Sequence, residues 1–162
     1  MKPAKPANKM LLNGLLVKGR RFCAYRDRTV KEVKQKLYSL GASQSLTCQI
    51  ITILQNEQFI DEQRFALAFA RGKIENNKWG KIKIRHELQV RGLDSKTINQ
   101  ALESIDPERY LCVLQGVAKA KIKTFSSLDE FTAKGKTAEY CSRKGFEMDL
   151  IWVALGEVKG DK

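Results

Sequence analysis

Positively charged side chains are the residues of this chain whose type and spacing could do chemistry. Lys78, Lys81 and Arg85 follow one another at intervals of three and four, so a helix would carry all three on one face. Arginine binds phosphate or carboxylate bidentately, which suits an anionic partner. Basic helix faces are often merely solvated, but their recurrence along the chain favours a contact surface. The candidate contact residues are Arg20, Arg21, Arg26, Arg28, Lys31, Lys34, Arg64, Arg71, Lys73, Lys78, Lys81, Arg85 and Arg91.

The overall charge supports the same interpretation. The 162 residues include 30 Lys and Arg against 18 Asp and Glu, a formal net charge of +12. The excess lies towards the N-terminus, because the first 50 residues hold 11 basic and only 2 acidic residues. Such a bias favours a nucleic acid or an acidic protein surface as partner, although a basic protein without an anionic partner has the same composition.

Motifs of catalysis and of cofactor binding are missing from the sequence. There is no P-loop and no GxSxG, and the only histidine, His86, lacks the second histidine of a metalloprotease motif. Cys23, Cys48, Cys112 and Cys141 form no CxxC pair, so zinc spacing is absent. We therefore expect a protein that is not an enzyme and needs no cofactor or metal, with His86 on a helix surface and the cysteines as small core residues.

The sequence holds no apolar run of membrane-spanning length. The basic start, through about residue 17, is interrupted by Asn13 and Gly14 and is not followed by a small-residue cleavage site. We expect a flexible start, no membrane contact and a cytoplasmic protein.

Helical spacing dominates the rest of the chain. Thr29 and Glu32 fit a capping box, in which the threonine caps a helix and the glutamate reaches back to it. Asp106 followed by Pro107 is a second strong start signal. The sequence predicts an all-α protein of about nine short helices, with further caps at Ser43, Asp61 and Asp94 and a helix start at Asp129 and Glu130.

One helix–glycine–helix pattern occurs three times. Gly41, Gly92 and Gly145 align, an apolar residue stands four positions earlier, and another follows each glycine. Helices often end in this way, but three copies in near-equal register indicate a true repeat. We expect an elongated array of three tandem three-helix repeats: residues 1–57 with the flexible start, 58–105 and 106–162.

Several residues of the middle repeat are predicted to be structural anchors. Phe65 and Phe69 stand one helical turn apart, at core spacing. Trp79 opens a predicted helix and is a packing anchor in preference to a base-stacking residue. Leu88 and Gly92 belong to the repeated pattern.

These residues also carry a resemblance to a known family. The sequence FIDEQRFA at residues 59–66 is followed by Trp79–Leu88 and then by Arg91–Leu93. The arginine-rich start at Arg26–Thr29 and the basic-Gly-Phe pattern at Arg143–Phe146 repeat parts of this motif. In this combination the chain resembles the RecX family, regulators of the RecA recombinase, over residues 22–157.

The resemblance implies a curved, elongated array of three-helix repeats, and we expect a monomer. It also implies a non-enzymatic negative regulator in DNA repair, homologous recombination and the SOS response. Such proteins bind in the groove of RecA filaments on single-stranded DNA and inhibit recombinase, ATPase and co-protease activity. A direct, salt-sensitive DNA-binding module that acts through the basic helix faces is the alternative, and weak direct DNA binding is compatible with both. Cys141 stands where the family commonly has leucine, and residues 119–137 carry no distinctive motif.

Overall fold

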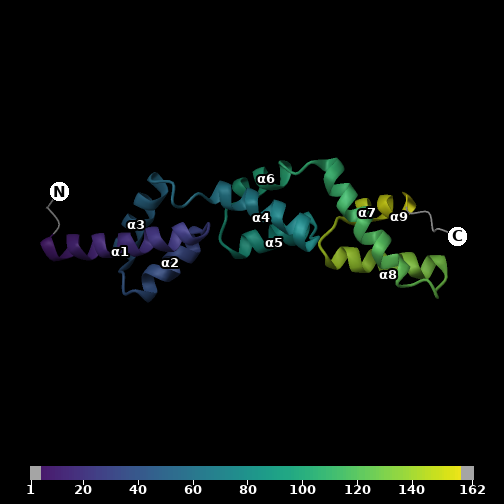
Figure 1. Ribbon diagram of the computed structural model, residues 1–162, viewed down its shortest axis with the longest axis horizontal. Helices are drawn as coiled ribbons and strands as arrows, with labels where there is room; N and C mark the ends of the chain where they lie inside the picture. Colours follow the sequence, from purple (N-terminus) through teal and green to yellow (C-terminus); the bar gives the residue numbers. More distant parts are fainter. Residues whose placement is uncertain (1–4, 158–162) are drawn as a thin grey trace. The chain divides into compact units, whose positions relative to one another are not determined.

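The computed structural model describes residues 5–157, and this part of the chain contains α-helices and no strand (Figure 1). The all-α prediction is confirmed. The helices are α1 (Pro6–Tyr25), α2 (Val30–Ser39), α3 (Gln44–Asn56), α4 (Glu62–Asn77), α5 (Lys81–Val90), α6 (Ser95–Glu103), α7 (Pro107–Lys123), α8 (Glu130–Arg143) and α9 (Met148–Glu157).

Side chains before the helices accept hydrogen bonds from the first-turn amides, as predicted. The Thr29 hydroxyl accepts from the Glu32 amide at 3.2 Å, and Glu32 accepts from the Thr29 amide at 2.9 Å, which completes the capping box. Three further caps are confirmed, at Ser43, Asp61 and Asp106, and Asp129 caps α8 at the predicted helix start. The cap at Asp94 stays a prediction.

The three repeated glycines share one backbone conformation. Gly41, Gly92 and Gly145 have φ angles of 86°, 83° and 97°, in the left-handed region that favours glycine at the end of a helix. The apolar residues around them are buried: Leu37, Leu88 and Cys141 before the glycines, and Ala42, Leu93 and Phe146 after them. The sequence register of the repeat therefore corresponds to a structural register.

The chain divides into two compact units. One comprises the residues up to Phe65 together with Arg91–Asp94, and the other comprises Ala66–Val90 and the residues from Ser95 onward. The limits predicted for the three repeats stay predictions.

Helices α1, α2 and α3 pack together in the first unit. The prediction of a flexible start was wrong for residues 6–17, because α1 begins at Pro6 and buries Leu15 and Leu16. Residues 1–4 lie outside the described part of the chain. Gly19 lies in the middle of α1, where α3 approaches closely and leaves little room for a side chain. A Cβ on Gly19 would come within 3.2 Å of Leu54 Cδ1. Thr47 on α3 is fully buried, and its hydroxyl has no hydrogen-bond partner in the part of the chain that the structure describes.

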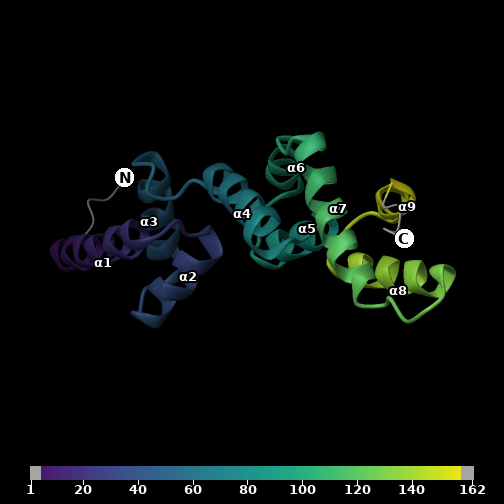
Figure 2. The ribbon, with the colours of Figure 1, turned by 45° about the vertical axis from the view of Figure 1, so that its right-hand side comes forward.

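In the second unit, α7 packs against α8 and α9, and α5 packs against α6 (Figure 2). The rings of Tyr110 on α7 and Phe146 before α9 lie with their centroids 5.4 Å apart. Tyr110 is almost completely buried, but its hydroxyl is satisfied. It donates to Glu147 at 2.6 Å and accepts from the Lys81 amide at 2.9 Å. Burial and the bond to Glu147 raise the pKa of the Tyr110 hydroxyl.

The start of α5 is fixed by the turn between α8 and α9. The Gly80 amide donates to the Lys144 carbonyl at 2.8 Å, and the Ile82 amide donates to the Gly145 carbonyl at 3.0 Å. The two backbones are so close that a Cβ on Gly80 would lie 2.1 Å from the Gly145 carbonyl carbon. The turn of the last three helices thus satisfies first-turn amides of a helix in the middle three.

Candidate anion-binding surface

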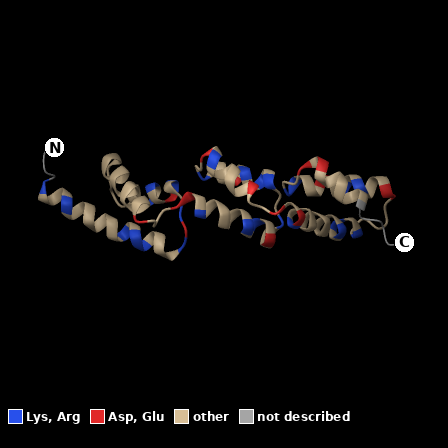
Figure 3. Cartoon of the chain, turned by 90° about the horizontal axis from the view of Figure 1, so that it is seen from above, with Lys and Arg blue, Asp and Glu red and all other residues tan. Residues whose placement is uncertain are grey.

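Helix α1 carries Lys9, Lys18, Arg20 and Arg21 and no acidic residue (Figure 3). Lys18 and Arg21 are exposed and three residues apart, so they share a face. Neither makes a hydrogen bond or ion pair with the part of the chain that is described. Arg21 was among the predicted contact residues, whereas Lys18 was not, although the same helical spacing indicates it.

Arg20 is engaged within the protein. Its guanidinium donates to both carboxylate oxygens of Glu57, at 2.8 and 2.5 Å. The hydrogen bond from Arg20 holds the pKa of Glu57 below its ordinary value. A phosphate at Arg20 would therefore have to displace a bidentate carboxylate.

Arg26 and Arg28 converge on Glu32. The Arg26 guanidinium lies 2.7 Å from the carboxylate, and that of Arg28 lies 3.7 Å away. Arg28 also sits over the Phe22 ring, 3.9 Å from its centroid, and its side chain is only 12% exposed. Burial raises the pKa of Glu32, but the Thr29 amide and the two arginines lower it more, so the net shift is downward. Arg28 is thus a packing residue of the first unit.

Arg64 and Arg109 hold equivalent places. Each follows a capping aspartate by three residues, and each reaches a carboxylate that precedes it in the chain: Arg64 reaches Asp27 at 3.1 Å, and Arg109 reaches Glu75 at 2.9 and 2.6 Å. Arg109 was not among the predicted contact residues, although its spacing from Asp106 matches that of Arg64 from Asp61.

Lys31 and Lys34 on α2 have different surroundings, and Lys31 lies close to the turn at Gly92. A Cβ on Gly92 would lie 3.6 Å from the Lys31 side chain. Lys34 is half-buried and faces Glu62, which accepts from the Val30 amide at 2.9 Å. Burial and the Asp94 carboxylate together raise the pKa of Glu62 more than the Val30 amide and Lys34 lower it.

Trp79 lies beneath two lysines. The ammonium groups of Lys73 and Lys83 are 4.8 and 4.4 Å from its ring centroid, and Lys73 is also 5.3 Å from the centroid of Phe69. Both aromatic residues are half-buried, whereas Phe65 is 7% exposed and Leu88 is fully buried. Cation–π contacts of this kind occupy the ring, which favours a packing role for Trp79.

The prediction that Lys78, Lys81 and Arg85 share one helix face was wrong, because Lys78 is not part of the helix that carries the other two. Lys78 lies in the turn after α4, with φ of 56° and its ammonium 2.6 Å from the Glu75 carbonyl oxygen. Lys81 and Arg85 lie on α5 and are half-buried. Lys81 covers the Tyr110 ring at 4.8 Å, and Arg85 donates to Asn99 at 2.7 Å.

A shallow hollow of about 260 Å³ beside Lys81 and Arg85 also contains the carboxylates of Glu103 and Glu147. These carboxylates make the hollow a poor site for phosphate.

Arg71 on α4 is exposed and has no hydrogen bond or ion pair with the described residues. Arg91, at the turn before Gly92, is half-buried.

Residues 5–157 hold no group of histidine, cysteine and acidic side chains that could bind a metal ion. His86 is exposed on α5, as predicted. Burial raises the pKa of the Cys23 and Cys141 thiols, but Cys48 and Cys112 are exposed, so the prediction of core cysteines was wrong for these two. Among the described helices, none has the length and apolar composition needed to span a membrane.

The sequence and the fold of this chain are similar to those of known proteins of one family. Residues 61–102 match the family model of the second three-helix domain of RecX, and residues 108–155 match that of the third. The regulatory protein RecX of Bacillus licheniformis is 27% identical over 136 residues, and that of Bacillus cytotoxicus is 25% identical over 141. These alignments cover 84% and 87% of this chain but 52% of each relative, so the chain spans about half the length of the curated relatives that it matches.

A crystal structure of RecX from Lactobacillus salivarius superposes with a TM-score of 0.87 and 22% identity, and covers 91% of this chain and 96% of that one. A second crystal structure, of regulatory protein RecX, gives a TM-score of 0.81 and 20% identity over 97% of this chain and 81% of that one. These likenesses establish the fold. The two family models together match more than half of the sequence, and the chain belongs to the RecX family.

Proposed function

We propose that this chain is a non-enzymatic negative regulator of RecA. It binds in the groove of RecA filaments on single-stranded DNA, and it inhibits recombinase, ATPase and co-protease activity in DNA repair and the SOS response. The observation that carries the proposal is the match of two successive three-helix domains to the family models, with relatives named regulatory protein RecX. Because those relatives are about twice as long, their function is extended to this chain only as a proposal.

The exposed cations support this function. Arg21 on α1 and Arg71 on α4 belong to different compact units, and each presents a guanidinium without a described internal partner. When two such contacts engage one filament, the second forms at a high effective concentration. Binding then depends on an intact filament, because separate RecA protomers do not link the contacts.

The test is the rate of ATP hydrolysis by RecA on circular single-stranded DNA. The rate should fall as the protein approaches stoichiometric amounts, and electron microscopy of the same mixtures should show filaments with an altered groove or reduced length. An unchanged rate at stoichiometric amounts would refute the proposal.

The Lys81→Ala, Arg85→Ala double variant tests the middle repeat in the same assay. Both residues are predicted contact residues. If they contact the filament, the variant should inhibit RecA more weakly than the parent and keep the same helix content. Full inhibition by the variant would remove the α5 face from the contact surface.

A direct DNA-binding module is the second candidate. It is favoured by α1, which carries no acidic residue, and by the 11 basic against 2 acidic residues among the first 50. Its test is binding to single-stranded DNA without RecA over a salt titration, since phosphate contacts weaken steeply with salt. Nanomolar affinity at physiological salt favours this candidate, and weak binding that is lost at moderate salt leaves DNA contact an accessory role.

A further inference from the structure

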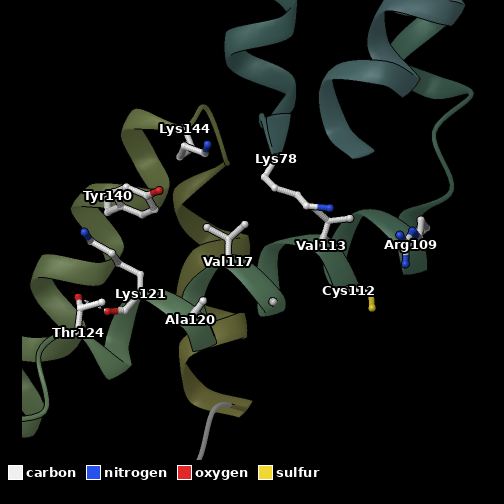
Figure 4. A pocket seen from close by; sticks show the side chains of 11 residues that line it. Lys78, Arg109, Cys112, Val113, Val117, Ala120, Lys121, Thr124, Tyr140 and Lys144 are labelled. Atoms are coloured by element: carbon white, nitrogen blue, oxygen red, sulfur yellow. Dashed lines mark hydrogen bonds between the residues drawn. The ribbon is translucent and has the colours of Figure 1, made fainter. Parts of the chain in front are cut away.

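The last three helices form a groove that neither candidate function uses. It has a volume of about 480 Å³ and lies along α7, beside α8 and the turn after α4 (Figure 4). Its floor is aliphatic, made by Val113, Val117 and Ala120 on one face of α7. The α7 residues that line it run from Arg109 to Lys121, which at 1.5 Å per residue gives a length of about 18 Å.

Four cations and no carboxylate line this groove. They are Lys78, Arg109, Lys121 and Lys144. Arg109 is held by Glu75, which is not among the lining residues. The other three are lysines, so the groove keeps a surplus of positive charge after this pair is discounted.

The three lysines are positioned but retain donors. Lys78 and Lys144 each donate one hydrogen bond from the ammonium, to the carbonyls of Glu75 at 2.6 Å and Asn77 at 2.8 Å. An ammonium has three donors, so each of the two retains capacity for an anion. The negative end of the α4 dipole offsets about half a charge at this place. Lys121 covers the Tyr140 ring, 4.5 Å from the centroid.

We propose that this groove binds a short acidic segment of a partner protein. An apolar side chain of the segment packs on Val113 and Val117, and carboxylates on either side of it contact Lys121 and Lys144. The aliphatic floor favours a peptide over single-stranded nucleic acid, because bases bind on open aromatic faces and the Tyr140 ring already carries an ammonium. This proposal does not depend on the proposed binding to RecA filaments.

Gly116 provides a test that leaves the cations in place. It lies on the groove face of α7, and a Cβ built on it meets nothing within 4 Å, so a larger side chain enters the groove without a clash. Gly135 on α8 is equally open and does not line the groove. Gly116→Glu and Gly135→Glu therefore have the same net charge and the same gain in helix propensity. They differ in where the carboxylate lies.

The experiment measures fluorescence anisotropy of a labelled peptide of about ten residues, acidic except for two leucines four residues apart, with full-length protein. The parent should bind it. Gly116→Glu should weaken binding at least tenfold by placing a like charge in the site, and Gly135→Glu should change it less than twofold. Circular dichroism confirms that both variants fold, and Gly116→Leu, which fills the floor without charge, should weaken binding as well.

Three results would overturn the proposal. The first is that the parent protein shows no measurable binding of the acidic peptide. Equal losses in the two glutamate variants would mean general attraction to a basic protein. A thymidine oligonucleotide that displaces the peptide, and whose own binding is lost in Gly116→Glu, would assign the groove to nucleic acid. Inhibition of RecA is measured separately, so that failure of the groove leaves the proposed function standing.

Discussion

Replacement of Gly80 by alanine should destabilise the second unit more than its single added methyl group suggests. The Cβ would lie 2.1 Å from the Gly145 carbonyl carbon and 2.2 Å from both the Gly145 oxygen and the Phe146 nitrogen. Carbon atoms in contact normally lie about 3.5–4.0 Å apart, so the two backbones must separate by about 1.5 Å. All three obstructing atoms belong to the backbone, and no side-chain rotation can relieve the overlap.

The separation breaks the hydrogen bonds between the two segments. The bonds from the Gly80 and Ile82 amides, now 2.8 and 3.0 Å long, would stretch beyond 4 Å, outside the limit of about 3.2 Å for such a bond. The Gly80 amide is left without a partner at a buried position, which costs about 1–3 kcal/mol, and the amide of the exposed Ile82 loses a hydrogen bond worth about 1 kcal/mol. We therefore expect Gly80→Ala to lower the free energy of unfolding by about 2–4 kcal/mol, a large part of the 5–15 kcal/mol of a typical domain.

Urea unfolding followed by circular dichroism measures the change in the free energy of unfolding. Gly72→Ala is the matched control, because it lies in α4 and its Cβ meets only a flexible asparagine amide at 4.0 Å. That variant should be neutral or more stable by up to about 1 kcal/mol. A loss of less than 1 kcal/mol in Gly80→Ala would show that the interlocked backbones do not carry the stability assigned to them.

Four other changes have defined outcomes. Phe65→Ala truncates a buried aromatic ring and should lower the free energy of unfolding by about 3–5 kcal/mol, measured by urea unfolding. Thr47→Val replaces a buried hydroxyl that has no partner in the described structure, and it should raise the free energy of unfolding by about 1 kcal/mol. A lower free energy of unfolding would indicate that the hydroxyl is hydrogen-bonded. The pKa of Glu32 is lowered by folding, so its contribution to stability is present above about pH 4.3 and is lost as the pH falls through the lowered value. Glu32→Gln should accordingly show a shallower loss of stability in acid than the parent. Arg21→Ala combined with Arg71→Ala should keep helix content and weaken inhibition of RecA ATP hydrolysis, and undiminished inhibition would exclude these two exposed cations as contacts.

The helices and turns of this protein follow from local chemistry, and this explains why they could be predicted. A capping box, an aspartate before a proline and a glycine after an apolar residue act within a few residues of one another, as at Thr29, Asp106 and Gly41. The repeat added a second constraint, because the same glycine conformation had to recur at Gly92 and Gly145.

The basic side chains were harder to assign, because their environment depends on residues distant in sequence. Arg20 pairs with Glu57, and Arg109 pairs with Glu75. Helical spacing alone indicates neither pair, since the partners are more than thirty positions apart. The end of α4 is a second example, because Lys78 adopts a left-handed φ that most residues other than glycine avoid, and this removes it from the face that spacing predicted.

The contact between the start of α5 and the α8–α9 turn also has a consequence for synthesis on the ribosome. Gly145 follows Gly80 by about 65 residues, so at 5–20 residues per second the acceptors for the Gly80 and Ile82 amides appear about 3–13 s later. During this interval α5 has no permanent acceptors for these amides, and water must supply them. The middle of the nascent chain should therefore stay open to hydrogen exchange until the last three helices have emerged.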